Sequence, residues 1–379
     1  MFLQVHALTS YPASLLNRDD AGLAKRIPFG NATRLRVSSQ CLKRHWREAI
    51  VPSLPEVPDG LRSTHFFSRE VLRRVIGQGV NEDTARTLIK TLADLLIKGG
   101  VEDDGNLKQP VLFGLREADY FAAMIAQAAR GAHNAQAASQ ALSERLKSKE
   151  EKKNLVAMMQ SAAGLTAALF GRMVTSDLLA RVDAPVHVAH AFTVHAAQTE
   201  MDYFTVVDDL ATEEETGGAH LGQTELGAGV YYVYVAVDVP LLSSNLTGIA
   251  ARTWKSQDTN IARAVLAELI RVIARQSPGA KLGATAPYAY ADLMLLEAGR
   301  AQPRSLANAF LGAISTREGH ITQQAAQRMV HYLQRLDDAY GPTAEQRALT
   351  TALDPASFHG LTPAPLETAI ASALDAVWS

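Results

Sequence analysis

The sequence predicts an α+β fold: an RRM-like (ferredoxin-like) split βαβ core that carries a large helical insertion and a long protruding hairpin. Four segments are rich in β-forming residues, namely 2–9, 184–195, 229–239 and 287–297. Helical periodicity follows the first of them, at 40–50, and the third, at 258–276. A longer helical run fills residues 64–180, between the first helix and the second strand. The order β, α, insertion, β, connection, β, α, β is that of the split βαβ core.

The first helix is expected to begin after Ser38 and Ser39, because serine is a favoured N-cap residue. One face of this helix is apolar and is formed by Leu42, Trp46, Ala49 and Ile50. The other face is polar and is formed by Gln40, Lys43, Arg44 and Arg47. We therefore expect the apolar face to pack on the core and the basic face to meet solvent or a ligand. Pro52 and Pro55 end the helix.

The elements divide the chain into five predicted segments. They are the first part of the core (1–63), the helical insertion (64–183), a core strand (184–199), the protruding hairpin (200–228), and the second part of the core (229–379). The last segment is expected to hold a strand, a helix, a further strand and C-terminal helices at 306–314, 323–340 and 366–379.

Composition places the chain among globular proteins. It has 379 residues, a net charge of −2, 47% hydrophobic residues and 20% charged residues. Cys41 is the single cysteine, which excludes intramolecular disulfides and Cys-based zinc sites and fits a reducing compartment. The start, MFLQVHALTSYP, lacks the pattern of a signal peptide, and no run reaches 18 apolar residues. We therefore expect a cytoplasmic protein that does not contact a membrane.

The charge is locally uneven, because residues 17–47 hold many cations against only two acids, Asp19 and Asp20. The cations are Arg18, Lys25, Arg26, Arg34, Arg36, Lys43, Arg44 and Arg47. Exposed cations neutralise phosphates, and a helix N-terminus adds donors for phosphate oxygens, so a nucleic-acid backbone is the predicted ligand. The alternative is a solvated basic face of an amphipathic helix.

The other candidate sites are weaker. His187, His190 and His195 alternate across a predicted strand and cannot converge on a metal, so ordinary surface histidines are expected. Asp208 and Asp209 could hold Mg²⁺, but they fit an exposed turn better. Walker, nucleophile-elbow and dinucleotide motifs are absent from the sequence, and we predict neither metal nor cofactor.

Five stretches, in this order, resemble the backbone subunit of the type I-E CRISPR Cascade complex, the CasC family of the RAMP superfamily. They are LNRDDAGLAKRIPFGNATRLRVSSQCLKRHWR, GRMVTS, FTVVDDL, GGAHLGQTELGAGVYY and PGAKLGATAPY. The resemblance implies a hand-like protein with an RRM-like palm, helical fingers and a protruding thumb. It also implies a non-catalytic role in antiviral defence, in which several copies bind along one CRISPR RNA. The implied partners are that RNA, target DNA, further copies of the chain, and the large, small and guide-end capping subunits of Cascade.

The resemblance also assigns residues. Those implied to hold the guide RNA are Arg18, Lys25, Arg36, Ser38, Gln40, Lys43, Arg44, Arg47, Arg172, Met173 and Lys281. Phe204, Thr205 and Leu221 of the thumb are implied to kink it. Lys147, Lys149, Lys152 and Lys153 of the fingers are implied to attract target DNA. The acidic stretch ATEEETGG in the thumb is longer than the family pattern.

Two other functions remain open at this point. One is a type III-like backbone endoribonuclease that cuts target RNA with a metal and an aspartate, for which Asp19 and Asp20 are the candidates. The other is a monomeric RRM-like adaptor for unrelated RNAs.

Overall fold

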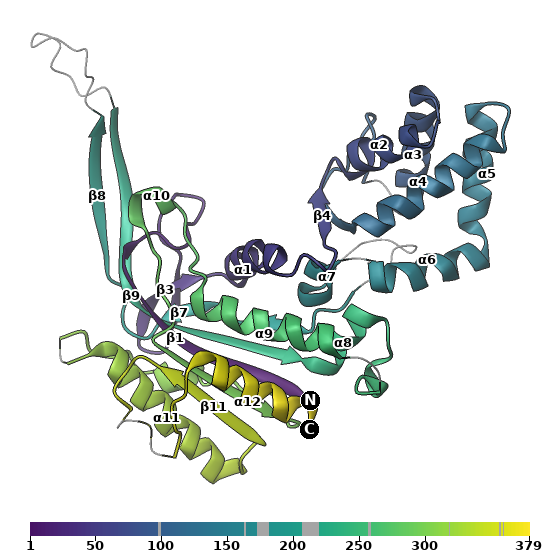
Figure 1. Cartoon of the computed structure of the whole chain (residues 1–379). Coiled ribbons are helices and arrows are strands. Elements are labelled where there is room, and N and C mark those ends of the chain that lie inside the picture. Colours follow the sequence, from purple (N-terminus) through teal and green to yellow (C-terminus); the bar gives the residue numbers. More distant parts are fainter. Residues whose placement is uncertain are drawn as a thin grey trace, which may run out of the picture. The chain divides into compact units, whose positions relative to one another are not determined.

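The structure of the chain, a computed structural model, divides into two compact units (Figure 1). The first unit comprises Met1–Ile50, His187–Asp238 and Arg263–Ser379, and the second comprises Val51–Val186 and Val239–Ala262. The structure describes residues 1–97, 100–162, 164–172, 182–206, 220–256, 259–317, 319–355, 358 and 360–379. Helices and antiparallel strands both contribute, which confirms the predicted α+β class.

The first unit is built on an antiparallel sheet with the strand order β11-β10-β1-β9-β7-β3-β2, and β6 and β8 also pair with β9. The strands are β1 (Phe2–Ser14), β2 (Arg26–Phe29), β3 (Ala32–Val37), β6 (Val186–Val188), β7 (Ala191–Thr193), β8 (Thr199–Val206), β9 (His220–Asp238), β10 (Leu293–Gly299) and β11 (Gln346–Thr351). β1 is central, with Val5 opposite Leu296 of β10 and Val235 of β9. Its residues are buried on both faces of the sheet, which explains why its sequence is largely apolar.

The first unit also contains helices. They are α1 (Ser39–Ser53), α9 (Asn260–Arg275), α10 (Leu282–Thr285), the short 3₁₀ helix η3 (Ala307–Phe310), α11 (Ile321–Tyr340) and α12 (Leu366–Trp378). Figure 1 shows α9 and α12 running along the sheet. One core cluster joins Leu8, Tyr232 and Leu295 of the sheet to Phe310 of η3 and Met329 of α11. The sheet is therefore the rigid support from which the loops of this unit extend.

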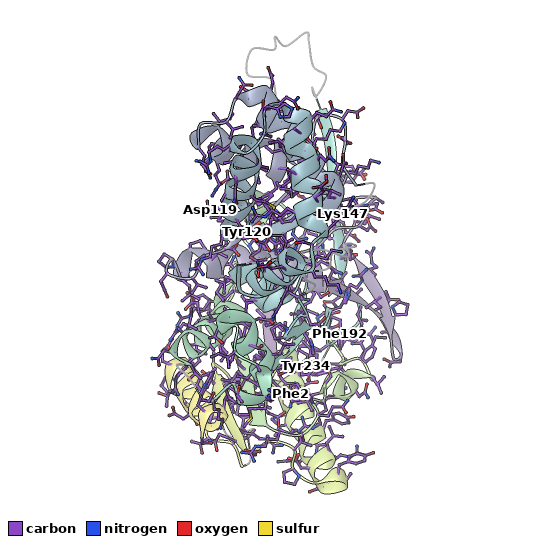
Figure 2. All side chains as sticks on the ribbon, turned by 90° about the vertical axis from the view of Figure 1, so that its right-hand side faces the viewer. Phe2, Asp119, Tyr120, Lys147, Phe192 and Tyr234 are labelled. Carbon is purple, nitrogen blue, oxygen red and sulfur yellow. The ribbon has the colours of Figure 1, made fainter. Side chains whose placement is uncertain are left out.

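The second unit is mainly helical. It contains η1 (Phe66–Val71), α2 (Leu72–Gly77), α3 (Glu82–Leu96), α4 (Leu115–Arg130), α5 (Ala135–Lys147), α6 (Lys149–Ala162), α7 (Leu165–Phe170), α8 (Val239–Thr247), η2 (Ala251–Thr253) and the strand pair β4 (Gly60–Ser63) and β5 (Val111–Gly114). Stacked Phe66 and Phe113 lie in its core with Phe121 of α4. Figure 2 labels Tyr120 of α4, whose hydroxyl bonds Glu151 of α6, so polar contacts also join these helices.

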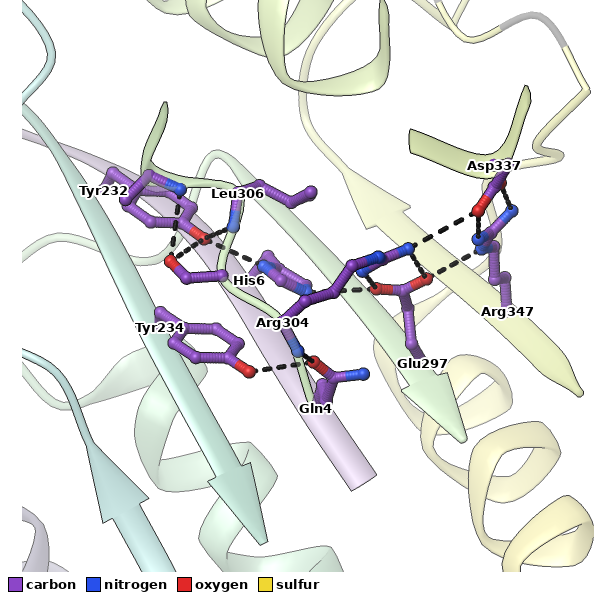
Figure 3. A network of polar contacts seen from close by, with 11 residues as sticks. Gln4, His6, Tyr232, Tyr234, Glu297, Arg304, Leu306, Asp337 and Arg347 are labelled. Atoms are coloured by element: carbon purple, nitrogen blue, oxygen red, sulfur yellow. Dashed lines mark hydrogen bonds and ion pairs between the residues drawn. The ribbon is translucent and has the colours of Figure 1, made fainter. Parts of the chain in front are cut away.

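A buried polar network lies within the first unit (Figure 3). The Glu297 carboxylate of β10 accepts hydrogen bonds from Arg304 at 2.8 Å, from Arg347 of β11 at 2.8 Å, and from His6 of β1 at 3.1 Å. Arg347 also pairs with Asp337 of α11 at 2.6 Å. The network therefore joins three neighbouring strands and one helix, and its buried charges are balanced by hydrogen-bonded partners.

The observed elements differ from the prediction in several places. The predicted strand at 184–195 is two short strands, and the last predicted core strand begins at Leu293 rather than at residue 287. Only η3 is helical within the predicted helix at 306–314, and the prediction lacks β11. Residues 239–262 fall in the second unit, whereas the sequence grouped them with the core. Within the described residues, no helix has the length and apolar character that a membrane span requires.

Candidate nucleic-acid interface

A hollow of about 700 Å³ opens in the first unit at the start of α1. Its walls come from the loop after β1, from α1 as far as Ala49 and from the segment between α9 and α10. Four residues that the sequence assigned to the guide RNA line it: Arg18, Ser38, Gln40 and Arg44. Asn17, His45, Gln276 and the acidic Glu48 also line it. The hollow thus combines cations, amides and a helix start, the groups that bind phosphate and sugar oxygens, with one carboxylate, Glu48, that pairs with Arg44.

The start of α1 is fixed by its serine cap. Ser38 Oγ accepts a hydrogen bond from the Cys41 N–H at 3.3 Å, and the Ser38 N–H donates to Asn17 Oδ1 at 2.9 Å. This geometry confirms Ser38 as the N-cap residue. Leu42, Trp46 and Ile50 form the buried face, as predicted. Because that face is packed in the core, the remaining face of α1 is the one available to a ligand.

The loop from Asn17 to Lys25 is held by hydrogen bonds to a side chain and to the backbone. Asp19 Oδ1 accepts from the N–H groups of Ala21 at 3.0 Å and Leu23 at 2.9 Å, so this carboxylate stabilises its own turn. The Lys25 N–H donates to the Asn17 carbonyl at 2.9 Å. Arg18 is exposed and Lys25 is half-buried at the two ends of the turn. Both cations therefore extend from an ordered loop, as a binding site requires.

The cations of α1 differ in their surroundings. Arg44 is exposed and pairs with Glu48 at 2.9 Å, and this hydrogen bond raises the pKa of the Arg44 guanidinium. Lys43 and Arg47 are half-buried, and burial lowers the pKa of the Lys43 ammonium. Gln40 is exposed beside them. The basic face predicted for this helix is thus confirmed as solvent-accessible, although Arg44 already has an acidic neighbour.

The two arginines of β3 differ in burial and in their hydrogen-bond partners. Arg34 is buried, and its guanidinium donates to the carbonyl oxygens of Thr193 at 3.0 Å and Phe310 at 2.8 Å. Its inclusion in the basic ligand surface is therefore wrong, because these bonds hold it inside the unit. Arg36 is half-buried and lies 3.0 Å from His190 Nδ1. Strand alternation does not explain the difference, because residues two apart lie on the same face of a strand. The partners differ instead: Arg34 bonds carbonyl oxygens of β7 and η3, whereas Arg36 bonds the Arg26 carbonyl and His190.

The predicted thumb corresponds to the hairpin of β8 and β9. Phe204 lies opposite Gly222, and Thr205 lies opposite Leu221. The Phe204 side chain is 42% exposed, and Thr205 is exposed as well. The side chain of Leu221 and the whole of Met173 lie outside the described residues, as do Asp208, Asp209 and the acidic stretch ATEEETGG.

Lys281 is not part of the α1 surface. Its Nζ lies 5.4 Å from the centroid of the Phe204 ring and donates to Thr224 Oγ1 of β9. The structure thus brings Lys281 to the predicted thumb residues instead of placing it beside Lys43 and Arg47. No local sequence pattern indicated this contact, because its partners lie more than fifty residues away.

The second unit holds the remaining predicted residues. Arg172 is buried, and its guanidinium pairs with buried Glu117 at 2.7 Å, so the expectation that it meets a guide RNA is corrected. Burial opposes ionisation of the Glu117 carboxyl and raises its pKa despite this partner. The four lysines of the fingers are exposed at the end of α5 and the start of α6 (Lys147 in Figure 2); they are Lys147, Lys149, Lys152 and Lys153.

The histidines do not converge. His195 is buried; its Nε2 accepts from the Val230 N–H at 3.2 Å and its Nδ1 donates to the Ala196 carbonyl at 2.7 Å. Burial lowers the pKa of this imidazole. His187 in β6 and His190 directly before β7 are exposed. In the described part of the chain, no three His, Cys, Asp or Glu side chains gather where they could hold a metal ion.

Known proteins resemble the whole chain. A family model described as "CT1975-like protein" matches residues 3–376. The chain belongs to this family. It is similar to a chain of a solved "CRISPR RNA-guided surveillance complex, pre-nicking", with 26% identity, a TM-score of 0.79 and 100% of both chains covered. A chain of a second "CRISPR RNA-guided surveillance complex" shares the fold at 24% identity and a TM-score of 0.62, with 99% of both chains covered. No curated protein sequence matches.

In this CT1975-like protein, sequence reasoning missed several residues that build the site. Asn17 holds the cap of α1, and Glu225 of β9 holds the basic loop by accepting from the Ala24 N–H at 2.7 Å and by pairing with Arg26. His45 Nε2 accepts from the Gly279 N–H at 3.3 Å and joins α1 to the loop before α10. The sequence offered two signals for these contacts: Asn17 directly before Arg18, and the turn Gly279-Ala280-Lys281. Neither signal identifies the residue that it contacts.

Proposed function

We propose that the chain is a non-catalytic, CRISPR RNA-binding backbone subunit of a type I-E Cascade surveillance complex. Several copies would bind along one guide RNA and present it to target DNA in antiviral defence. The observation that carries the proposal is the hollow at the start of α1, lined by Arg18, Gln40 and Arg44. The full-length likeness to a chain of a CRISPR RNA-guided surveillance complex supports it.

The chemistry of the hollow favours backbone binding over base reading. Cations and amides at a helix start hold phosphate and sugar oxygens whatever the base sequence. Lys43 and Arg47 extend the same helix face beyond the hollow. Sequence would then be read by base pairing between guide and target, while the protein holds the guide by its backbone. This division of work needs no pocket that distinguishes one base from another.

The topology supports an RRM-like palm with a thumb and fingers. The strands β10, β1, β9 and β7 are neighbours in that order, and α1 and α9 follow β1 and β9, as in a split βαβ core. The β8–β9 hairpin would be the thumb and would kink the guide through Phe204 and Thr205. The helical second unit would be the fingers, with its exposed lysines near target DNA. Contacts with the other Cascade subunits would complete the assembly.

The proposed absence of catalysis rests on the chemistry of the acidic pair. A metal-dependent nuclease needs a carboxylate whose oxygens are available to the metal, yet Asp19 Oδ1 is occupied by two backbone N–H groups. We expect the assembled protein to leave target RNA intact in Mg²⁺, with or without the substitutions Asp19→Ala and Asp20→Ala. Cleavage by the unsubstituted protein that the double variant loses would favour the type III-like endoribonuclease instead.

The test of RNA binding is the pair Lys43→Ala and Arg47→Ala. We expect the affinity for single-stranded RNA to fall by roughly 10- to 100-fold, because two charge-assisted contacts are lost. The slope of log K against log salt should fall by about 0.7 for each phosphate contact removed. Both effects should be the same for guides of unrelated sequence. Fluorescence anisotropy of labelled RNA over a salt series measures them.

Arg252→Ala with Lys255→Ala is the matched control, because it removes one Arg and one Lys that are exposed in the second unit. A loss of equal size in the control, or a loss confined to some sequences, would contradict backbone binding at α1. RNA that co-purifies with the chain separates the proposal from a monomeric adaptor. A uniform repeat–spacer species supports the backbone role, and heterogeneous cellular RNA contradicts it.

A further inference from the structure

Lys281 has an unusual backbone conformation for its residue type. Its φ is 87° and its ψ is 50°, in the left-handed region, and Ala286 at the other end of α10 has a φ of 39°. Among the described residues, these two are the non-glycine positions with positive φ. A glycine would meet either conformation without the steric cost of a Cβ. Lys281 therefore adopts a conformation that its residue type disfavours, and the contacts of its side chain offer the compensation.

The side chain of Lys281 lies against the thumb hairpin. Its ammonium lies over the Phe204 ring of β8, with 5.4 Å between Nζ and the ring centroid, and donates to Thr224 Oγ1 of β9. The Phe204 ring covers Gly222 of the facing strand, where an added Cβ would overlap it. The Phe204 ring thus packs on the backbone of Gly222, and the Lys281 ammonium lies over the ring.

The backbone next to Lys281 belongs to the wall of the hollow. The Gly279 N–H donates to His45 Nε2 of α1 at 3.3 Å, and the Ala280 N–H donates to the Leu15 carbonyl at 2.8 Å. Gly279, Ala280 and Leu282 all line the hollow. One short loop therefore contacts the phosphate-binding site through its backbone and the hairpin through a single side chain.

We propose that Lys281 is a positioning residue that holds Phe204, and with it the hairpin, at a defined place relative to the hollow, and that it is not a phosphate ligand. This inference rests on the proposed function, because it concerns how a guide RNA held in the hollow meets the hairpin. It replaces the role that the resemblance assigned to Lys281. A cation–π contact and a hydrogen bond supply the attraction, and the strained backbone aims the side chain.

The variant Lys281→Gly distinguishes the effect of the side-chain contacts from the effect of the backbone strain. It relieves the strain at this position but removes both contacts with the hairpin. In the RNA-free full chain, we expect amide hydrogen exchange in β8 (Thr199–Val206) to rise by about 2- to 5-fold, with no loss of thermal stability. Lys281→Arg should restore slow exchange, because a guanidinium also stacks on an aromatic ring and donates hydrogen bonds. Ala286→Gly is the matched control and should leave the exchange of β8 unchanged.

RNA binding supplies the second measurement. We expect Lys281→Gly to leave the slope of log K against log salt unchanged, since no phosphate contact is removed. A slope lower by about 0.7, together with unchanged exchange in β8, would make Lys281 a phosphate ligand and overturn the inference. Unchanged exchange with an unchanged slope would also overturn it. If the unsubstituted chain binds no RNA, the proposed function fails, and the exchange measurement still decides whether Lys281 holds the hairpin.

Discussion

The Glu297 network in Figure 3 allows a quantitative prediction about stability. Glu297→Gln preserves the size of the side chain but removes its charge. Arg304 and Arg347 then keep Asp337 as their remaining acidic neighbour in the network, at 3.6 Å and 2.6 Å. We therefore expect the variant to fold, because the shape of the core is unchanged, but to be markedly less stable.

The magnitude follows from burial. Glu297 is fully buried, whereas the side chains of Arg304 and Arg347 are 18% and 21% exposed. Removing one partner of a fully buried ion pair costs about 3–5 kcal/mol, and the partial exposure of the two arginines lowers this to about 2–4 kcal/mol here. Glu367→Gln is the matched control in the same unit. Its pair with Arg271 is exposed, so the expected loss is below about 1 kcal/mol.

The network also predicts a pH dependence. Burial disfavours the charged form of Glu297, but hydrogen bonds from His6 and Arg304 outweigh it and hold the pKa of this carboxyl far below its ordinary value of 4.5. Its contribution to stability is therefore present above pH 4.5 and decreases as the pH falls below that value. Burial likewise lowers the pKa of His6 from 6.5, so a second loss of stability begins below pH 6.5.

The measurement is the free energy of unfolding by urea between pH 7 and pH 3. The difference between the unsubstituted chain and Glu297→Gln should be largest near neutral pH. It should shrink below pH 4.5 by up to about 1.4 kcal/mol per pH unit, because only the unsubstituted chain loses the ionised carboxylate's contribution. A difference that stays constant with pH, or one no larger than that of Glu367→Gln, would refute the reasoning.

Three further changes test other parts of the structure. Ser38→Ala removes the cap of α1 and should lower the free energy of unfolding by about 1 kcal/mol, measured by urea denaturation. Arg172→Met leaves Glu117 buried without its partner and should destabilise the chain by about 3–5 kcal/mol in calorimetry, whereas an RNA-contacting arginine would cost no stability. Lys152→Ala with Lys153→Ala should weaken binding of double-stranded DNA in gel shifts and leave RNA binding intact; equal losses for both would contradict a separate DNA surface.

Features that depend on neighbours in the sequence were predictable. The spacing of Leu42, Trp46 and Ile50 predicted the buried face of α1, and the serines before it predicted the cap that Ser38 forms. A helix satisfies its own backbone bonds, so its period and its capping residue are local signals. The split of the 184–195 strand and the late start of β10 were not predictable in this way. Strand boundaries depend on which distant strand offers hydrogen-bond partners.

The burial of cations also depends on distant partners and was therefore not predictable from the local sequence. In the sequence, Arg34 belongs to the basic segment 17–47 and Arg172 precedes Met173, so both were expected at the surface. In the structure, both are buried. Arg34 bonds a carbonyl 276 residues away, and Arg172 pairs with a carboxylate 55 residues away. Charge and amphipathic pattern cannot report such partners, because the partners come from elements that are distant in the sequence.

The sequence by itself determined the α+β class, the basic first helix and its cap, because these follow from local periodicity, composition and capping chemistry. Only the tertiary structure decided which of the cations can reach a ligand. In that structure, Arg18, Gln40 and Arg44 line one hollow. Arg34 and Arg172 are buried, and Lys281 contacts Phe204 of the hairpin. The physical reason is that accessibility depends on desolvation and on partners from distant elements, and both arise only when the chain folds.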